Sequence, residues 1–347
     1  MKHRASRVRR AIGVLLATCS VASCSGNAAL PGEIVGVAVE PTVPTTSTPP
    51  ECTEAEDDED ATPSYPPLAE LPAPGAMPAG STMERIHSRG RLIVGVSADT
   101  LLFGARNPLT DRIEGFDIDM LSEVARAIFG DPPAGDAAGD ITERIEYRVI
   151  TYADRLPSLE SGAVDIVAHT MTINCRRWLR IAFSSEYFHA GQKVLVKSGS
   201  GVATIDDLAA QGGTVCAPEG STNIDELSNV TKYPGLVVIG KADISDCLVA
   251  MQQGEADATS GDDTVLAGFA AQDPNTEVVG ERFTDEPYGL GFNRDDVDLV
   301  QFANAVIEQM RTDGRWADIY QRWLVDTGAL PGGVAEAPPA NHTRVLP

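Results

Sequence analysis

The chain has 347 residues, of which 43% are hydrophobic and only 5% aromatic, and its formal net charge at pH 7 is −23. This charge argues against nucleic acid and anionic membrane surfaces as partners, because both repel an acidic protein. Beyond residue 24, no apolar run reaches the ~20 residues that a membrane-spanning helix needs. We therefore expect any attachment to a membrane at the N-terminal end.

The N-terminal segment has the features of an export signal. Basic residues precede an apolar run, Ala11 to Ala17, that is too short to span a bilayer. Small residues then lead into Cys24, a pattern that resembles the signal of bacterial lipoproteins. The resemblance implies cleavage of residues 1–23 and a lipid on the Cys24 thiol, which holds the protein at the outer face of the cell membrane. Cleavage before Cys19, or an ordinary secretory signal cut near Ala22, are the alternatives.

Residues 24–80 have a composition that argues against a packed fold. They contain a Pro/Thr-rich run (41–50), an acidic run (54–60) and a Pro-rich stretch (63–78). Such segments bury too little apolar surface to offset the entropy cost of ordering them. We expect a lipidated, disordered stalk that reaches on the order of 100 Å at ~3.1 Å per residue. The Pro/Ala/Gly-rich tail, residues 331–347, is expected to be disordered as well.

The part between stalk and tail alternates between strand and helix patterns. The elements predicted in its first half are strand 91–96, helix 116–129, strand 145–150, helix 155–161 and strand 164–168. Those predicted in its second half are strand 192–197, helix 206–211, strand 214–217, a helix from 222, strand 236–239, a helix from 245 and strand 256–260. Repeated β-α-β units predict mostly parallel sheets flanked by helices, and the length favours two α/β lobes over one core.

Five separated blocks within residues 85–326 carry a family likeness. They are Leu92–Val96 with Phe103, Glu114–Asp119, Asp165–Arg177 with Ile181–Ser184 and Tyr187–Phe188, Asp257–Ala258 with Asp262–Asp263, and Asp313–Trp323. In this order they resemble the family 3 extracellular solute-binding proteins, receptors for polar amino acids in ABC importers. Within that family, the expected stalk together with the four cysteines of the mature chain looks most like the glutamine-binding lipoproteins of actinobacteria.

The resemblance implies a two-lobe α/β fold of the periplasmic-binding-protein type II. Lobe 1 would comprise residues 85–192 plus 290–330 and lobe 2 residues 193–288, with hinge strands near Gly191–Val194 and Pro287–Gly291. It implies a monomer without a cofactor that binds a polar amino acid (Asp, Glu, Asn or Gln) between the lobes and delivers it to an ABC permease. The alternatives are a sensor for a membrane signalling protein and, less favoured, a dehydratase on the same fold. No nucleophile elbow or Walker loop supports an enzyme.

Arg177 is the main candidate for ligand recognition. A guanidinium binds a carboxylate through two parallel, charge-assisted hydrogen bonds. The resemblance implies that Arg177 binds the ligand carboxylate, with the Thr172 hydroxyl and the Thr170 amide as further donors. The alternative is that Arg177 lies on the surface of a helix, as we expect for Arg176.

The second lobe is expected to supply the acceptor for the ligand ammonium and further donors for an anionic group. Asp262 follows a predicted strand at the end where α/β proteins bind ligands, and it is the expected acceptor for the ligand ammonium. The alternative is a solvated acid beside Asp263. Ser221 and Thr222 precede a predicted helix whose amides favour anions, although simple capping by Thr222 explains the same pattern equally well.

Four further residues complete the expected contacts in lobe 1. The resemblance implies that Tyr152 forms an aromatic wall, that Arg155 faces the ligand side chain, and that Ser97 and Phe103 lie in the loop after the first strand. A surface ion pair is the alternative for Arg155. Asp117, at the start of the first long helix, is expected to cap it and to face solvent.

Six cysteines are present, and four remain once Cys19 and Cys24 are set aside. An even number in an oxidising compartment favours two disulfides, although the sequence allows three pairings. Our hypothesis pairs Cys216 with Cys247 within lobe 2, and Cys52 with Cys175 between the stalk and lobe 1. Neither the cysteines nor the histidines have the spacing of a metal site, so none is expected.

Overall fold

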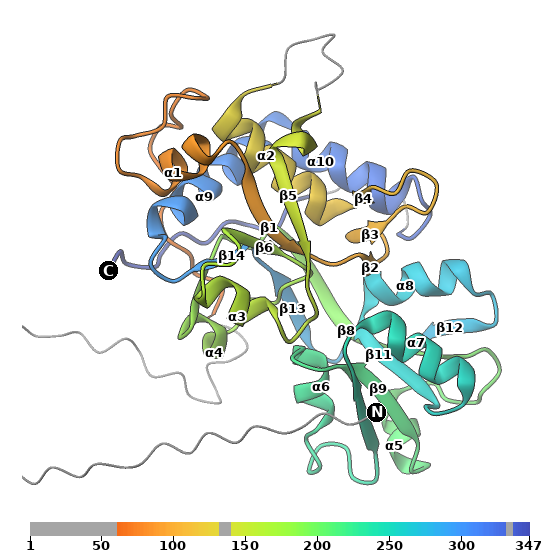
Figure 1. Cartoon of the computed structure of the whole chain (residues 1–347). Helices are drawn as coiled ribbons and strands as arrows, with labels where there is room; N and C mark the ends of the chain where they lie inside the picture. The colour runs from red at the N-terminus through yellow and green to blue at the C-terminus, as the bar shows by residue number, and fades with distance from the viewer. Residues whose placement is uncertain (1–60, 132–139, 331–335) are drawn as a thin grey trace, which may run out of the picture. The chain divides into compact units, whose positions relative to one another are not determined.

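The computed structural model of the protein describes residues 61–131, 140–330 and 336–347 (Figure 1). In these ranges the α-helices are α1 (Thr82–Arg89), α2 (Phe116–Phe129), α3 (Arg155–Glu160), α4 (Cys175–Trp178), α5 (Ile205–Ala210), α6 (Thr222–Leu227), α7 (Ile244–Gln253), α8 (Asp263–Gln272), α9 (Val297–Asp313) and α10 (Arg315–Tyr320). The strands are β1 (Leu92–Val96), β2 (Asp99–Thr100), β3 (Gly104–Arg106), β4 (Ile113–Glu114), β5 (Ile145–Val149), β6 (Ile166–Ala168), β7 (Ile181–Phe183), β8 (Phe188–Lys197), β9 (Thr214–Pro218), β10 (Val237–Lys241), β11 (Ala258–Asp262), β12 (Thr276–Val279), β13 (Asp285–Tyr288) and β14 (Gly291–Asn293).

The first sheet has the strand order β5-β1-β6-β14-β7. Strand β1 runs parallel to β5 and β6, whereas β14 returns late in the chain and pairs antiparallel with β6 and β7. All of β1 is buried, as expected for a parallel strand covered on both faces. Helix α2 covers this sheet with an apolar face, so the helix predicted for residues 116–129 is confirmed. It begins after Gly115, which has a φ of 144° and where an added Cβ would lie 2.1 Å from the Phe103 carbonyl oxygen.

The second sheet has the strand order β10-β9-β11-β8-β12, with β13 paired to β8 outside this path. Parallel pairs link β9 to β10 and β11, while β8 runs antiparallel to β11 and β12. Two apolar clusters fill this part, one on the side of α7 and α8 and one that includes α5 and Tyr233. The predicted two-lobe α/β fold is confirmed, with sheets that are mixed rather than purely parallel.

Strand β8 connects the two lobes as one continuous element (Figure 1). Its first residues, Phe188 and Ala190, pack in the core of the first lobe. Its later residues, Val194 and Leu195, pack in the two clusters of the second lobe. Strand β13 pairs with the early half of β8 and leads back to β14 in the first sheet. The stretch predicted as the first hinge, residues 191–194, therefore lies inside a paired strand.

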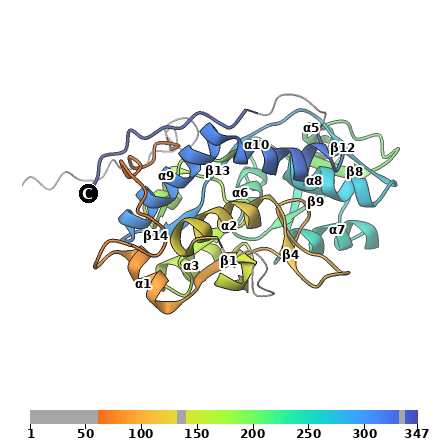
Figure 2. The same cartoon turned by 90° about the horizontal axis from the view of Figure 1, so that it is seen from above.

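The chain ends depart from the prediction of disorder. The sequence predicts disorder for residues 24–80 and 331–347, but residues 61–80 and 336–347 are ordered against the first lobe, where they run beside α9 (Figure 2). These segments make few hydrogen bonds of their own, and side chains of the folded lobe supply the missing partners, such as Asn304 for the Tyr65 carbonyl at 2.7 Å. Amino-acid composition predicts whether a segment can fold by itself, but it does not show whether another part of the protein supplies hydrogen-bond partners for it. The expected signal 1–23, the lipidation site Cys24 and the remainder of the expected stalk and tail lie outside the described residues.

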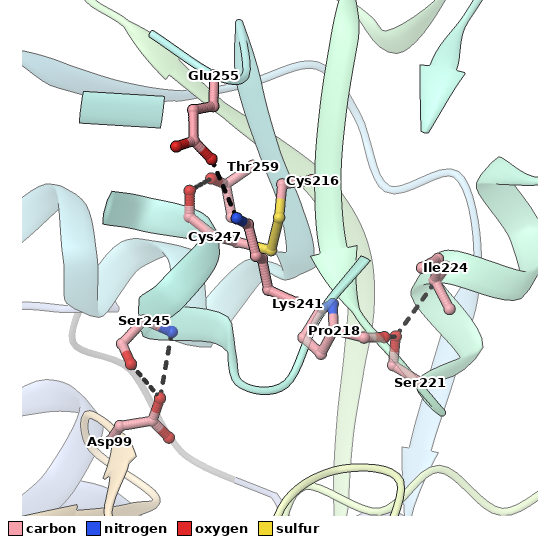
Figure 3. The surroundings of a disulfide bond; sticks show 10 residues. All are labelled: Asp99, Cys216, Pro218, Ser221, Ile224, Lys241, Ser245, Cys247, Glu255 and Thr259. Atoms are coloured by element: carbon pink, nitrogen blue, oxygen red, sulfur yellow. Dashed lines mark hydrogen bonds and ion pairs between the residues drawn. A yellow bond between two sulfur atoms is a disulfide. The ribbon is translucent and has the colours of Figure 1, made fainter. Parts of the chain in front are cut away.

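Cys216 in β9 and Cys247 in α7 form the disulfide that the sequence favours, with an S–S distance of 2.00 Å (Figure 3). Both residues are fully buried, and the Thr259 hydroxyl donates to the Cys247 carbonyl at 3.1 Å beside them. Cys175 is also disulfide-bonded, whereas Cys52, its expected partner, lies outside the described residues. None of the helices in the described ranges combines the length and apolar character needed to cross a bilayer.

We predict that a Cys216→Ser, Cys247→Ser double variant loses about 3 kcal/mol of unfolding free energy, because the cross-link spans 31 residues and limits the unfolded chain. Urea denaturation of both proteins under oxidising conditions measures the difference. In dithiothreitol the wild type should move toward the variant. Equal midpoints for the two oxidised proteins would contradict the prediction.

Candidate functional site

Arg177 lies at the junction of the two lobes. It belongs to the one-turn helix α4, which Asn174 caps by accepting a hydrogen bond from the Arg177 amide at 2.9 Å. Its side chain is 6% exposed, and its guanidinium donates to the Thr172 carbonyl at 2.6 Å and to the Gly220 carbonyl at 3.4 Å. Gly220 belongs to the turn between β9 and α6 of the second lobe. The alternative that Arg177 is a surface residue is therefore wrong.

Arg155 approaches the same carbonyl from the start of α3. Its side chain is 1% exposed, so the alternative of a surface ion pair is wrong as well. Its guanidinium donates to the carbonyls of Tyr152 at 3.0 Å, His169 at 3.1 Å and Gly220 at 3.0 Å. The Tyr152 ring lies 4.6 Å from its central carbon, a distance at which the ring face attracts the cation.

These two cations share one backbone oxygen, the Gly220 carbonyl. In the described part of the chain, neither guanidinium makes an ion pair with an acidic side chain, and the hydrogen bonds of both go to backbone carbonyls. Burial, and secondly repulsion from Arg155, lower the pKa of Arg177 to about 9, which keeps it charged at pH 7. A buried charge without a counter-ion is costly. The pair is thus arranged to accept an anionic group.

A buried carboxylate, Glu286 in β13, joins the two lobes nearby. Its Oε2 accepts hydrogen bonds from the Thr172 hydroxyl at 2.6 Å and from the Thr222 hydroxyl at 2.7 Å, and its Oε1 accepts one from Thr284 at 2.7 Å. Thr172 follows β6 of the first lobe and Thr222 opens α6 of the second. Both threonines are therefore in place to bind a carboxylate, and in this structure they bind one supplied by the chain.

Ser221, rather than Thr222, caps α6. Its hydroxyl accepts a hydrogen bond from the Ile224 amide at 3.2 Å and donates to the Pro218 carbonyl at 2.7 Å (Figure 3). The capping explanation of Thr222 is therefore wrong. Because the cap is supplied one residue earlier, the Thr222 hydroxyl remains free for contacts in the site.

Asp262 supplies a second buried carboxylate, at the end of β11. Its Oδ1 accepts a hydrogen bond from the Asn223 side chain at 2.9 Å, and its Oδ2 accepts one from the Tyr288 hydroxyl. Burial, and secondly the Glu286 carboxylate, raise its pKa to about 7. The alternative of a solvated acid is wrong, because only 6% of Asp262 is exposed.

The Thr170 amide is not free to donate to a ligand in this structure. It donates to Oδ2 of Asp117 at 2.8 Å, and the Tyr187 hydroxyl donates to the other oxygen of Asp117 at 2.6 Å. The prediction that Asp117 caps α2 and faces solvent is wrong: it is buried, it caps nothing, and burial raises its pKa to about 6. Thr170 itself has a φ of 42°, in the left-handed region that costs energy for a β-branched residue. Asp117 therefore fixes a strained turn next to Arg155 and Arg177.

The remaining residues that the sequence predicts as ligand contacts, Tyr152, Ser97 and Phe103, differ in their surroundings. Tyr152 is buried and stacks edge-on with His169 at 4.5 Å, so it forms a wall of the Arg155 site. The Ser97 hydroxyl is engaged by Asp99 at 2.7 Å and Thr100 at 2.8 Å, within its own loop. Phe103 is buried in an aromatic cluster with Phe116, Phe188 and Tyr288. Phe103 thus supports the site through Tyr288.

A cavity of about 540 Å³ opens beside this junction, a size typical of small-molecule sites. Thr172, Thr222 and Glu286 line it, whereas Arg177 and Asp262 do not; Arg177 reaches the lining only through its hydrogen bond to the Thr172 carbonyl. Another contact between the lobes closes a different edge: Asp99 accepts a hydrogen bond from the Ser245 amide at the start of α7 at 3.1 Å (Figure 3). Among residues that the structure describes, no group of three or more His, Cys, Asp or Glu side chains could hold a metal ion.

Sequence reasoning missed Glu286, Tyr288 and Asn223. Glu286 and Tyr288 are two residues apart in β13, the strand that pairs with β8. Side chains two positions apart in a strand point to the same side, so these two share one face. That alternation, next to an expected hinge, was the available signal for Glu286. Asn223 follows Ser221 and Thr222 directly in the sequence. Its role could not be predicted, because only the fold brings its side-chain amide within 2.9 Å of Asp262.

Two α/β lobes with buried charges of both signs at their junction define a two-lobe binding protein. The chain belongs to the bacterial extracellular solute-binding proteins, family 3, which it matches over residues 92–326. It is 34% identical over 248 residues to the ABC transporter glutamine-binding protein GlnH of Bacillus subtilis, covering 72% of this chain and 86% of that protein. It is 30% identical over 263 residues to the glutamate-binding protein GluB of Corynebacterium efficiens, covering 74% and 85%.

Solved structures agree with this assignment. An ancestral arginine-binding protein bound to glutamine has a TM-score of 0.59 at 30% identity and covers 68% of this chain and 98% of its own. The ancestral amino acid-binding protein AncCDT-1, a precursor of cyclohexadienyl dehydratase, has a TM-score of 0.60 at 28% identity and covers 70% and 99%.

The raised pKa of Asp262 predicts a stability that depends on pH. Between its ordinary pKa of 3.8 and about 7, the folded protein holds a proton that the unfolded chain has lost, so the free energy of unfolding falls as pH rises through this window. Asp262→Asn removes this term, and the loss of stability from pH 5 to pH 8 should be smaller in the variant by on the order of 1–3 kcal/mol. Urea denaturation of both proteins at the two pH values measures it. The same loss in both proteins would show that Asp262 titrates normally.

Proposed function

We propose that the protein is an extracytoplasmic lipoprotein that reversibly binds a polar amino acid between its lobes and delivers it to an ABC importer. The observation that carries this proposal is the pair of buried guanidiniums, Arg155 and Arg177, that have no carboxylate partner within the described residues. An amino acid supplies the missing anion, and it brings an ammonium that needs an anion in return.

The charges of the site complement such a zwitterion. Arg177 exchanges its bonds to the Thr172 and Gly220 carbonyls for two bonds to the ligand carboxylate, which are stronger because both partners are charged. The hydroxyls of Thr172 and Thr222 add donors, and Glu286 gives them up. Asp262 accepts the ligand ammonium and becomes ionised as it does so. Because these groups come from both lobes, binding favours a closed arrangement of the lobes.

The proposed ligands are Asp, Glu, Asn and Gln. The names of relatives support this class, since they include glutamine-binding, glutamate-binding and glutamate/aspartate-import proteins. Arg155 is placed to favour an acidic ligand side chain. Its guanidinium is buried close enough to Arg177 for the two positive charges to repel each other, and a negative charge between them relieves that repulsion. The Tyr152 ring packs against the Arg155 guanidinium at 4.6 Å, and in this proposal it limits the length of the ligand side chain.

The proposed location and partner follow from the N-terminal sequence and the family. A lipid on Cys24 anchors the chain at the outer face of the membrane, where an ABC permease receives the ligand from the closed form. A membrane signalling protein that recognises the same closed form would make the protein a sensor. Uptake of labelled amino acid by a deletion strain tests the first role, and membrane retention of a Cys24→Ser variant tests the anchor.

A dehydratase is the second candidate, and two observations favour testing it. AncCDT-1, which has the same fold, is described as a precursor of cyclohexadienyl dehydratase, and a general acid needs a pKa near 7 such as that of Asp262. The Asn223 and Tyr288 bonds to Asp262, however, suit a fixed acceptor better than a group that transfers protons. We expect no turnover of prephenate by the purified protein.

Arg177→Ala should weaken binding of the preferred amino acid at least about 30-fold, which corresponds to ~2 kcal/mol or more for a desolvated charge pair. Isothermal titration calorimetry of the purified protein against Asp, Glu, Asn and Gln measures this effect. The matched control is Arg180→Ala, because Arg180 is three residues away and its half-exposed guanidinium pairs with Glu160.

The control should bind like the wild type. Wild-type affinity in Arg177→Ala would contradict the proposal that Arg177 binds the ligand carboxylate. Absence of binding to every polar amino acid by the wild type would contradict the proposed function itself.

A further inference from the structure

The two ends of the described chain pair with each other on the first lobe. The Ser64 amide donates to the Asn341 carbonyl at 2.8 Å, and the Arg344 amide donates to the Ser64 carbonyl at 3.1 Å. The Arg344 side chain adds a bond from Nε to the Pro63 carbonyl at 3.0 Å. We call residues 61–65 and 341–344 the terminal strap.

Buried side chains of the first lobe hold the strap in place. The Ser64 hydroxyl, which is fully buried, donates to the Phe183 carbonyl at the end of β7 at 2.8 Å. Asn304 in α9 donates to the Ser64 hydroxyl at 2.9 Å and to the Tyr65 carbonyl at 2.7 Å, and its own oxygen accepts from the Ser185 amide at 2.7 Å. The strap is therefore an integral part of this lobe and has a fixed register on it.

The strap encloses Trp178, the residue that follows Arg177. The Trp178 Nε1–H donates to the Ala61 carbonyl at 2.8 Å, and the Tyr65 ring meets the indole edge-on at 5.9 Å. The Arg344 guanidinium lies 3.7 Å from the centroid of the Trp178 ring, within the range of a cation–π contact. Both segments of the strap therefore contact the same indole.

Helix α4 cannot hold its own position. It spans Cys175–Trp178, a single turn, and an isolated turn of helix is unstable because nucleation costs more than one hydrogen bond returns. Arg177 and Trp178 leave this turn in different directions, the first to the Thr172 and Gly220 carbonyls and the second to the strap. The orientation of the Arg177 guanidinium thus depends on what fixes this turn from outside, and the contacts of Trp178 with the strap act there beside the Asn174 cap and the disulfide of Cys175.

We propose that the terminal strap is a positioning element for ligand binding, in which Arg344 and Trp178 set the orientation of α4 and hence of Arg177. This inference rests on the proposed function, because the ligand carboxylate is what Arg177 binds. Linkage makes the coupling reciprocal: ligand that stabilises Arg177 in its bound orientation also stabilises the strap, and anything that displaces the strap weakens ligand binding. Residue 61 continues directly into the N-terminal segment, so the strap gives the binding site a physical connection to that end of the chain.

The test uses the full mature chain and three variants: Arg344→Ala, Arg344→Lys and Trp178→Phe. Calorimetric titration with the amino acid that binds the wild type most tightly should give a Kd raised at least fivefold in Arg344→Ala and in Trp178→Phe, which loses the bond to Ala61. Arg344→Lys, which keeps a cation over the indole, should recover part of the loss. The control is Arg322→Ala, an exposed arginine of the same lobe that pairs with Asp119, and its Kd should stay within twofold of the wild type.

A second measurement separates positioning from mere stability. When ligand is added to the wild type, hydrogen exchange of the Ser64 and Arg344 amides should slow at least fivefold more than that of other amides of the first lobe, although neither residue contacts the site. A strap that only stabilises the fold would lower the melting temperature of Arg344→Ala but leave Kd at 15 °C, where the variant is folded, unchanged. Ligand would then slow the strap amides only as much as the rest of the lobe, because native-state binding slows all exchange through global unfolding. That result would overturn the proposal.

A third measurement needs no ligand. In the ligand-free protein, the Nε–H resonance of Arg177, identified by its loss in Arg177→Lys, should shift in Arg344→Ala and stay in place in Arg322→Ala. An unchanged resonance in Arg344→Ala would overturn the positioning role even if the wild type bound no amino acid. Failure of the wild type to bind, with a shifted resonance, would instead remove the proposed function and leave the strap as the element that sets Arg177.

Discussion

The structure of the site depends on two buried guanidiniums that face one backbone oxygen. Arg155 and Arg177 both donate to the Gly220 carbonyl, and each also donates to carbonyls of the first lobe. Carbonyl dipoles stabilise these cations partially, and a full negative charge would stabilise them much more. The protein as a whole is strongly acidic, and the nearby acids Asp262 and Glu286 act on this pair through their charge, without a hydrogen bond to either guanidinium among the described residues.

The fold places the groups that surround these two uncompensated positive charges. The carboxyl ends of β6 and β11, one in each sheet, bring Thr172 and Asp262 to the junction of the lobes, as expected for ligand sites of α/β proteins. Glu286 occupies the threonine hydroxyls of both lobes, so under the proposed function a ligand carboxylate replaces an internal one. The terminal strap adds a constraint from outside, because it holds the one-turn helix that carries Arg177.

Sequence reasoning anticipated those features that depend on local pattern or on a family motif. The helix at residues 116–129, the two-lobe fold and the disulfide between Cys216 and Cys247 belong to this group. It failed where a residue takes its role from distant partners. Asp117 reads as a helix cap but is buried against Thr170 and Tyr187, and the Pro-rich segment from residue 61 reads as disordered but takes its hydrogen bonds from Asn304 and Trp178. Glu286 escaped notice because its threonine partners lie 114 and 64 residues away in the chain.

The most direct test of the central claim is a crystal structure of the protein grown with glutamate or glutamine. Our account predicts ligand density between the lobes, with the α-carboxylate within ~3.2 Å of the Arg177 guanidinium and the ammonium in the same range of Asp262. It also predicts that Glu286 has left the Thr172 and Thr222 hydroxyls. A ligand bound elsewhere, with both guanidiniums still on the Gly220 carbonyl, would contradict it.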